Sequence, residues 1–182
     1  MSDSQLTVPP DISFEKAIDF THSLLSQMEQ ETLSDSEIQS LLAELVSSEN
    51  GARGFFVTYL TDDRSLADQP SEPVIQALQS SPAIVSDLLV KNLAMSTAMA
   101  ISHRRNSNLA MAQGSERVQR RSLNLIERLQ LPEAADKAQQ LHESATTGLG
   151  DYHQFLDRWH YDAEQRQAIR KAAEKVVDRV DS

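Results

Sequence analysis

Apolar side chains recur every three or four residues along most of the chain, which is the spacing of one face of an α-helix. The clearest case follows Ser34, where apolar residues occupy positions 38, 41, 42, 45 and 46. Ser34 and Glu37 stand three residues apart, as in the capping box that begins a helix. Asn50 and Gly51 are typical of a helix end. We therefore predict a helix between Ser34 and Gly51.

Other helix starts follow at short intervals and leave little room for strands. The signals predict starts near Ser13, Ser71, Ser81, Ser115, Pro132, Asp151 and Asp162. The helix after Ser81 runs to about Arg105 and carries small residues on several faces, which favours a central position. Asp162 and Gln165 have the spacing of a second capping box, at the start of the last helix.

The segment 51–60 is ambiguous by itself. Val57, Thr58 and Tyr59 favour a strand. Phe55, Phe56, Tyr59 and Leu60 have helical spacing, and a lone strand would find no partner elsewhere in the sequence. We therefore predict a helix here too. The whole pattern predicts an all-α fold: a single compact bundle of about seven to eight helices over residues 11–182, after a flexible N-terminal arm at 1–10.

Composition removes several classes of chemistry. The chain has no cysteine, which excludes disulfides, iron–sulfur clusters and thiolate zinc sites. Its five glycines form no phosphate-binding loop, and neither the G-x-S-x-G nor the H-E-x-x-H pattern occurs. We therefore predict no cofactor and assign no catalytic residue, although an enzyme without a short motif stays possible. The N-terminus does not resemble a signal peptide, and the absence of cysteine suits the reducing cytoplasm, where we expect the protein.

The apolar stretch 82–102 raises the question of a membrane span. Asp87 and Lys91 lie near its centre, and both would be costly in lipid, so we predict a buried helix of a soluble protein. Asp87 and Lys91 have the spacing of an ion pair within one helix. The alternative is that Lys91 and Asn92 hold a polar ligand.

Charge is spread unevenly along the chain. The net charge is −10, and residues 1–50 hold ten acids and one base. Residues 101–130 hold six arginines and two glutamates. Arg117, Arg120 and Arg121 share one helix face and form the centre of a basic ridge between Arg104 and Arg128. The ridge suits contact with the chain's own acidic helices or a second subunit, with a protein partner, or with nucleic acid.

Arg53 is the best local candidate for a binding site. It stands between Gly51 and Gly54 and precedes an aromatic group, which would suit an anionic ligand or an acidic motif. Alternatively, Gly51 only ends a helix and the aromatic residues fill the core. The aromatic residues concerned are Phe55, Phe56 and Tyr59.

Two Asp-x-x-His spacings, Asp19 with His22 and Asp157 with His160, could each present a carboxylate and an imidazole to a metal ion. His153 and His160 stand seven apart, so a helix would place them on one face with Asp157 between them. Chance accounts for the two Asp-x-x-His spacings, and we favour surface or capping roles for these residues and a short helix whose histidines face water.

These features support three hypotheses. The first is a non-enzymatic protein that acts through protein–protein interaction, as an adaptor, regulator or assembly factor, with self-association included. The second is a helical bundle that binds a small ligand or a metal through Arg53, Lys91 or the Asp-x-x-His pairs. The third is nucleic-acid binding through the basic ridge, which the acidic net charge disfavours.

Overall fold

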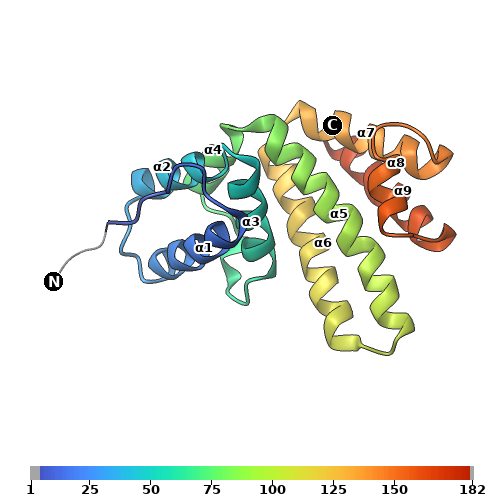
Figure 1. The fold of residues 1–182 in the computed structure, drawn as a ribbon, viewed down its shortest axis with the longest axis horizontal. Helices are drawn as coiled ribbons and strands as arrows, with labels where there is room; N and C mark the ends of the chain where they lie inside the picture. The colour runs from blue at the N-terminus through green and yellow to red at the C-terminus, as the bar shows by residue number, and fades with distance from the viewer. Residues whose placement is uncertain (1–4, 181–182) are drawn as a thin grey trace. The chain divides into compact units, whose positions relative to one another are not determined.

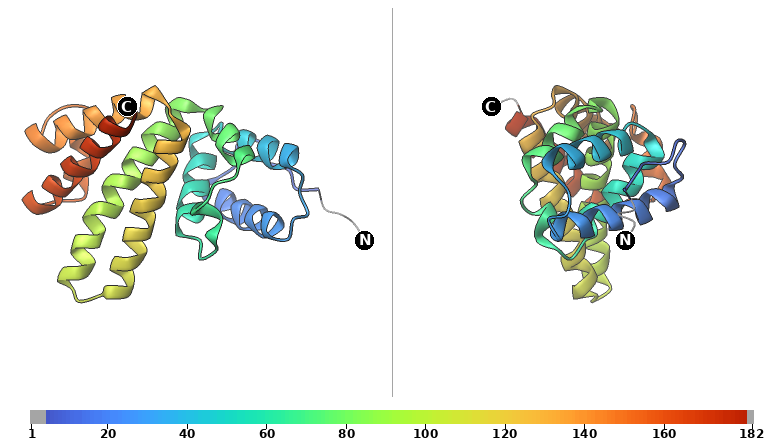
Figure 2. Two further views of the ribbon diagram at one scale, coloured as in Figure 1. Left: turned by 180° about the vertical axis from the view of Figure 1, so that it is seen from behind. Right: turned by 90° about the vertical axis from the view of Figure 1, so that its left-hand side faces the viewer.

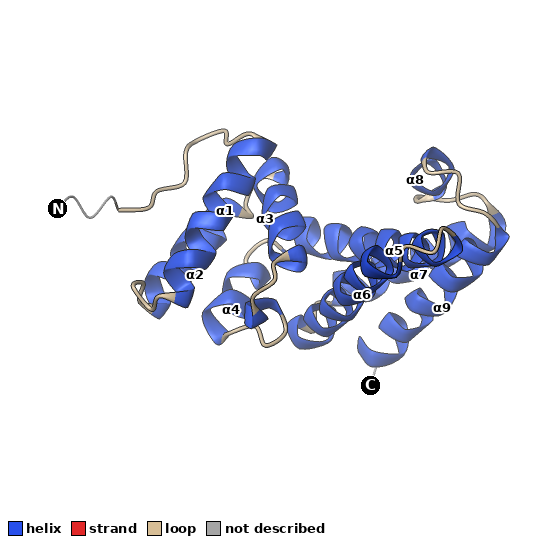
Figure 3. Cartoon of the chain, turned by 90° about the horizontal axis from the view of Figure 1, so that it is seen from below, coloured by secondary structure: helices blue, strands red, loops and turns tan. Residues whose placement is uncertain are grey.

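The computed structural model describes residues 5–180, with the side chain of Val180 excepted. In this range the chain forms nine α-helices, one 3₁₀ turn and no strand, which confirms the predicted all-α class (Figures 1 and 3). Residues 1–4 of the predicted arm lie outside the described residues, and residues 5–10 form no helix. The helices are α1 (Phe14–Glu29), α2 (Asp35–Leu45), α3 (Glu49–Thr61), α4 (Glu72–Gln79), α5 (Pro82–Arg105), α6 (Leu109–Leu129), α7 (Pro132–Thr147), α8 (His153–Arg158) and α9 (Ala163–Val180).

The contacts within the chain divide it into two compact units, residues 1–88 (unit 1) and residues 89–182 (unit 2). The first residues of α5 belong to unit 1 and the rest of this helix belongs to unit 2. The single domain expected over residues 11–182 stays a prediction.

Unit 1 is built from α1 to α4. Helix α1 packs against α3, and α2 packs against α4. The predicted capping box begins α2: the Ser34 hydroxyl accepts from the Glu37 N–H, and the Glu37 carboxylate accepts from the Ser34 N–H. The segment 51–60 is helical, as predicted, and its aromatic side chains are buried.

The prediction that Asn50 and Gly51 end a helix is wrong. Helix α2 ends at Leu45, and α3 begins at Glu49 after the N-cap Ser48. Gly51 therefore lies in the first turn of α3, where a Cβ atom would overlap the carbonyl oxygen of Leu45. These glycines serve close packing: Gly54 faces α1, and a Cβ there would stand 2.9 Å from the carbonyl oxygen of Phe14.

Unit 2 begins with a helical hairpin, in which α5 and α6 run side by side in opposite directions (Figures 1 and 2). Helix α9 packs against α7 and α6, and α8 packs against α7. The prediction that a helix starts at Ser115 is wrong. Asn108 is the N-cap of α6, and its side-chain oxygen accepts from the Met111 N–H at 3.2 Å, so the helix begins at Leu109.

Among the described residues, α5 alone has the length and composition of a membrane-spanning helix. In the structure, 56% of its apolar window is buried inside the protein. Its buried residues include Leu89, Leu93, Ala94 and Ala98. This degree of burial is typical of a core helix and fits the prediction of a buried helix.

Candidate functional site

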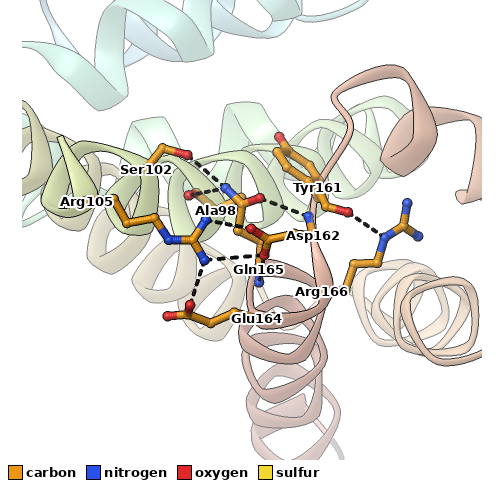
Figure 4. Close-up of polar contacts among 8 residues, drawn as sticks. All are labelled: Ala98, Ser102, Arg105, Tyr161, Asp162, Glu164, Gln165 and Arg166. Carbon is orange, nitrogen blue, oxygen red and sulfur yellow. Dashed lines mark hydrogen bonds and ion pairs between the residues drawn. The ribbon is translucent and has the colours of Figure 1, made fainter.

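An extensive polar cluster of unit 2 lies at the start of α9 (Figure 4). The predicted capping box is present: the Asp162 N–H donates to the Gln165 side-chain oxygen at 3.0 Å, and the Gln165 N–H donates to the Asp162 carboxylate at 3.0 Å. These two bonds satisfy backbone donors that the helix itself cannot.

The side chain of Gln165 also joins α9 to α5. Its amide nitrogen donates to the carbonyl oxygen of Ala98 at 3.0 Å and to the Ser102 hydroxyl at 2.8 Å. Gln165 is only 6% exposed, and both the oxygen and the nitrogen of its side-chain amide have hydrogen-bond partners. A buried amide satisfied in this way fixes the position of α9 on α5.

Arg105 extends the same contact at the end of α5 (Figure 4). Its guanidinium donates to Asp162 at 2.5 Å and to Glu164 at 2.6 Å. The hydrogen bond from Arg105 is the largest cause that lowers the pKa of the Asp162 carboxyl below its ordinary value, and the Gln165 N–H lowers it further. The carboxylates in turn raise the pKa of the guanidinium.

Tyr161 and Arg166 lie on the other side of the capping box. Burial raises the pKa of the Tyr161 hydroxyl to about 12. Arg166 donates to the Tyr161 carbonyl oxygen at 2.9 Å and to the Asp157 carboxylate at 2.9 Å. The hydrogen bonds of this cluster join α5, α8 and the start of α9 in one structural contact.

The arginines of the predicted basic ridge differ in their surroundings. Arg104 forms an ion pair with Glu116 of α6, and Arg105 pairs with the two carboxylates at the start of α9. Arg121 is 3% exposed, whereas Arg120 is exposed. Arg117 is half-buried and Arg128 is exposed. The ridge is therefore interrupted by burial and by ion pairs within unit 2.

In unit 1, Arg53 lies exposed on α3 with its guanidinium carbon 5.0 Å from the centre of the Phe14 ring. Phe55, Phe56 and Tyr59 are buried, and the rings of Phe55 and Tyr59 stack at 4.8 Å. The aromatic residues thus fill the core, which was the alternative to a binding site.

The candidate ligand residues of α5 also lie beside an aromatic ring. The ammonium of Lys91 stands 6.0 Å from the centre of the Phe155 ring, and Asn92 is half-buried next to it in the sequence. Arg53 and Lys91 thus each lie over an aromatic ring of their own unit.

The candidate metal ligands do not form a site. Asp19 and His22 are exposed on α1. The prediction of one helix face for His153, Asp157 and His160 is wrong, because α8 ends at Arg158 and His160 has a left-handed backbone with φ of 52°. Within residues 5–180, no group of three or more histidine, aspartate or glutamate side chains could hold a metal ion.

Shallow grooves lie on the described part of unit 2. One, of about 370 Å³, lies between α5, α6 and α9 and is lined by Ala100, Ile101, Ala168, Arg104, Glu116 and Gln119 among others. The second, of about 280 Å³, lies between α7 and α9, where His142 and Glu174 are 2.9 Å apart. Of the candidate residues predicted from the sequence, Arg104 of the basic ridge lines the first groove, and none lines the second.

Large apolar side chains are exposed mainly in unit 2. Of the six found in the described part of the chain, only Val57 belongs to unit 1. The others are Met99, Leu109, Met111, Leu149 and Trp159. Leu109 is 67% exposed and Met111 is 53% exposed, both in the first turn of α6 beside the turn of the hairpin. We call Leu109, Met111 and residues 106–108 the hairpin tip.

The hairpin tip was not predicted, because the start signal assigned to α6 was Ser115, whereas the helix begins at Leu109. The local signal is present, since Asn108 is a good N-cap residue and Leu109, Ala110 and Met111 favour a helix. A sequence pattern cannot show that these apolar residues stay uncovered.

Comparison with known proteins identifies a family and no relative of known activity. The family model described as "Uncharacterised conserved protein UCP020893" matches residues 13–176. No curated protein matches the chain, and no solved structure matches it.

Proposed function

Since the chain belongs to this family, whose description states no activity, we propose a function from the chain's own surface. The protein acts through protein–protein interaction, as a non-enzymatic adaptor, regulator or assembly factor, and its contact surface includes the hairpin tip. This keeps the first of the three hypotheses drawn from the sequence and gives it a location.

The exposure of Leu109 and Met111 carries the proposal. Two large apolar side chains within three residues are both more than half exposed. Single exposed apolar residues are common on protein surfaces, but a group of them is typical of a contact site. Figures 1 and 2 show the turn of the hairpin at its lower end, with no other helix of unit 2 over it. Met99 adds a third exposed apolar side chain on the same hairpin.

The helices behind the tip are well anchored. Arg104 of α5 pairs with Glu116 of α6, which joins the two helices of the hairpin. Gln165 and Arg105 join α9 to the end of α5. A surface held in place before binding loses less conformational entropy when the complex forms. These contacts therefore support a preformed surface.

Site-specific photo-cross-linking tests the proposal. A photo-reactive phenylalanine analogue replaces Leu109 in one preparation and Val57 in a matched control, since Val57 is an exposed apolar residue of unit 1. Each protein is irradiated in native lysate and as a purified sample, and the products are identified by mass spectrometry. We expect a discrete product, either with another protein or with a second copy, from position 109 and not from position 57.

A second variant shows whether the product depends on the apolar surface. Met111→Glu in the protein labelled at position 109 places a charge next to the probe, and we expect it to remove the product. Equal products from positions 109 and 57, or no product from position 109 in either sample, would contradict the proposal.

A further inference from the structure

We infer that the hairpin tip fits a second copy of this chain, so that the protein associates with itself through unit 2. The inference rests on the proposed function and names the partner of the same surface. It is carried by two observations: the distribution of charge between the units, and the ion pairs that surround the tip.

Charge separates the two units sharply. Residues 1–88 contain fifteen acids and three bases, a net charge of −12, whereas residues 89–182 contain twelve acids and fourteen bases, a net charge of +2. Two copies that met through unit 1 would bring strongly like-charged surfaces together. Unit 2 is close to neutral and carries five of the six exposed large apolar side chains among residues 5–180. Unit 2 is therefore where two copies meet with the least repulsion.

The arginines beside the tip already have partners. Arg104 pairs with Glu116, and Arg105 pairs with Asp162 and Glu164. An incoming surface therefore has no need to bring carboxylates to neutralise them. The pairing of these two arginines therefore disfavours a strongly acidic partner. A second copy of the tip fits better, because the tip presents apolar side chains and the charges of the two arginines are already compensated.

Apolar side chains also suit contact between identical surfaces. In a dimer with twofold symmetry the same patch lies on both sides of the interface, so each charge near the axis meets a copy of itself. Leucine and methionine avoid this repulsion and bury apolar area on both sides. Leu109 and Met111 thus provide a patch that can pack against its own copy.

Analytical ultracentrifugation of the purified full chain tests the inference. We expect a dimer that forms as the protein concentration rises from micromolar to millimolar. The double variant Leu109→Gln and Met111→Gln keeps the net charge and should raise the dissociation constant by at least about tenfold. Val57→Gln, the matched change in unit 1, should leave it unchanged. Circular dichroism shows whether each variant keeps its helices.

The dependence of dimerisation on salt concentration provides an independent test of the inference. Each copy carries a net charge of −10, so added salt screens the repulsion between copies and should strengthen a dimer held by apolar contact. A dimer that weakens with salt, or one that the Val57 change disrupts as much as the tip change, would overturn the inference.

Different results would contradict the proposed self-association and the proposed function. A wild-type chain that stays monomeric over the whole concentration range would overturn self-association. If position 109 then still cross-linked to a different protein in lysate, the proposed function would stand without it. If position 109 cross-linked to nothing in either sample, both would fall.

Discussion

The side-chain amide of Gln165 donates to the backbone carbonyl oxygen of Ala98 at 3.0 Å, across 67 positions of the sequence. The same residue closes the capping box that begins α9. One buried side chain therefore caps the start of α9 and also fixes α9 on α5. Helix α5 is one of the two helices of the hairpin whose tip we propose as a contact surface.

Replacement of this side chain should destabilise the protein. Gln165→Ala removes the bonds to Ala98 and Ser102 and leaves buried polar groups without their partner, which costs about 1–3 kcal/mol of unfolding free energy. Urea denaturation followed by circular dichroism measures the loss. Gln167→Ala, at an exposed position of the same helix, is the control and should change stability little. Equal stability of the two variants would show that the bonds of Gln165 contribute nothing.

The ion pair between Arg105 and Asp162 predicts a dependence of stability on acid. The folded state lowers the pKa of the Asp162 carboxyl, chiefly through the hydrogen bond from Arg105. A group with a lowered pKa stabilises the fold above its ordinary pKa of 3.8, and this contribution is lost as the pH falls through the folded value. Asp162→Asn should therefore lose less stability than wild type between pH 7 and pH 3.

Denaturation at those two pH values measures the difference. Glu133→Gln is a control, because Glu133 belongs to neither the Arg105 pair nor the capping box. A wild-type protein and an Asp162→Asn variant with the same loss of stability in acid would contradict the role given to this pair.

Gly54 should tolerate no larger residue. A Cβ atom at this position would meet α1, at 2.9 Å from the carbonyl oxygen of Phe14. Gly54→Ala should therefore cost about 1–3 kcal/mol through overpacking. Gly114→Ala is the matched control, since a Cβ at Gly114 meets nothing within 4 Å. Because alanine favours a helix more than glycine does, Gly114→Ala should instead stabilise the protein by about 0.5–1 kcal/mol. Thermal or urea unfolding of the two variants would contradict this account if both shifted in the same direction.

Local signals in the sequence predicted much of the fold. The capping boxes at Ser34 and Asp162 were predicted correctly because each depends on two side chains three residues apart. The all-helical class followed from repeated start signals and helical spacing. The end assigned at Gly51 was wrong because a glycine that ends a helix and one that lets two backbones approach look the same in a sequence.

The candidate surface depends on contacts that a sequence does not contain. Leu109 and Met111 continue a helical apolar pattern and would be assigned to a core by spacing alone. In the structure, α9 packs on α5 through Gln165, and Leu109 and Met111 at the start of α6 stay exposed. For the same reason, the sequence assigns Arg104 and Arg105 to a basic ridge, whereas in the structure they pair with Glu116 and Asp162.

The most direct test of the contact surface follows the methionine methyl groups. Among the five methionines, Met111 lies at the hairpin tip, whereas Met28 is half-buried on α1 of unit 1. In protein with ¹³C-labelled methionine methyl groups, we expect the Met111 signal to shift or broaden as the protein concentration rises or as native lysate is added, and the Met28 signal to stay unchanged. A Met111 signal that stays constant under both conditions would contradict the hairpin tip as a contact surface.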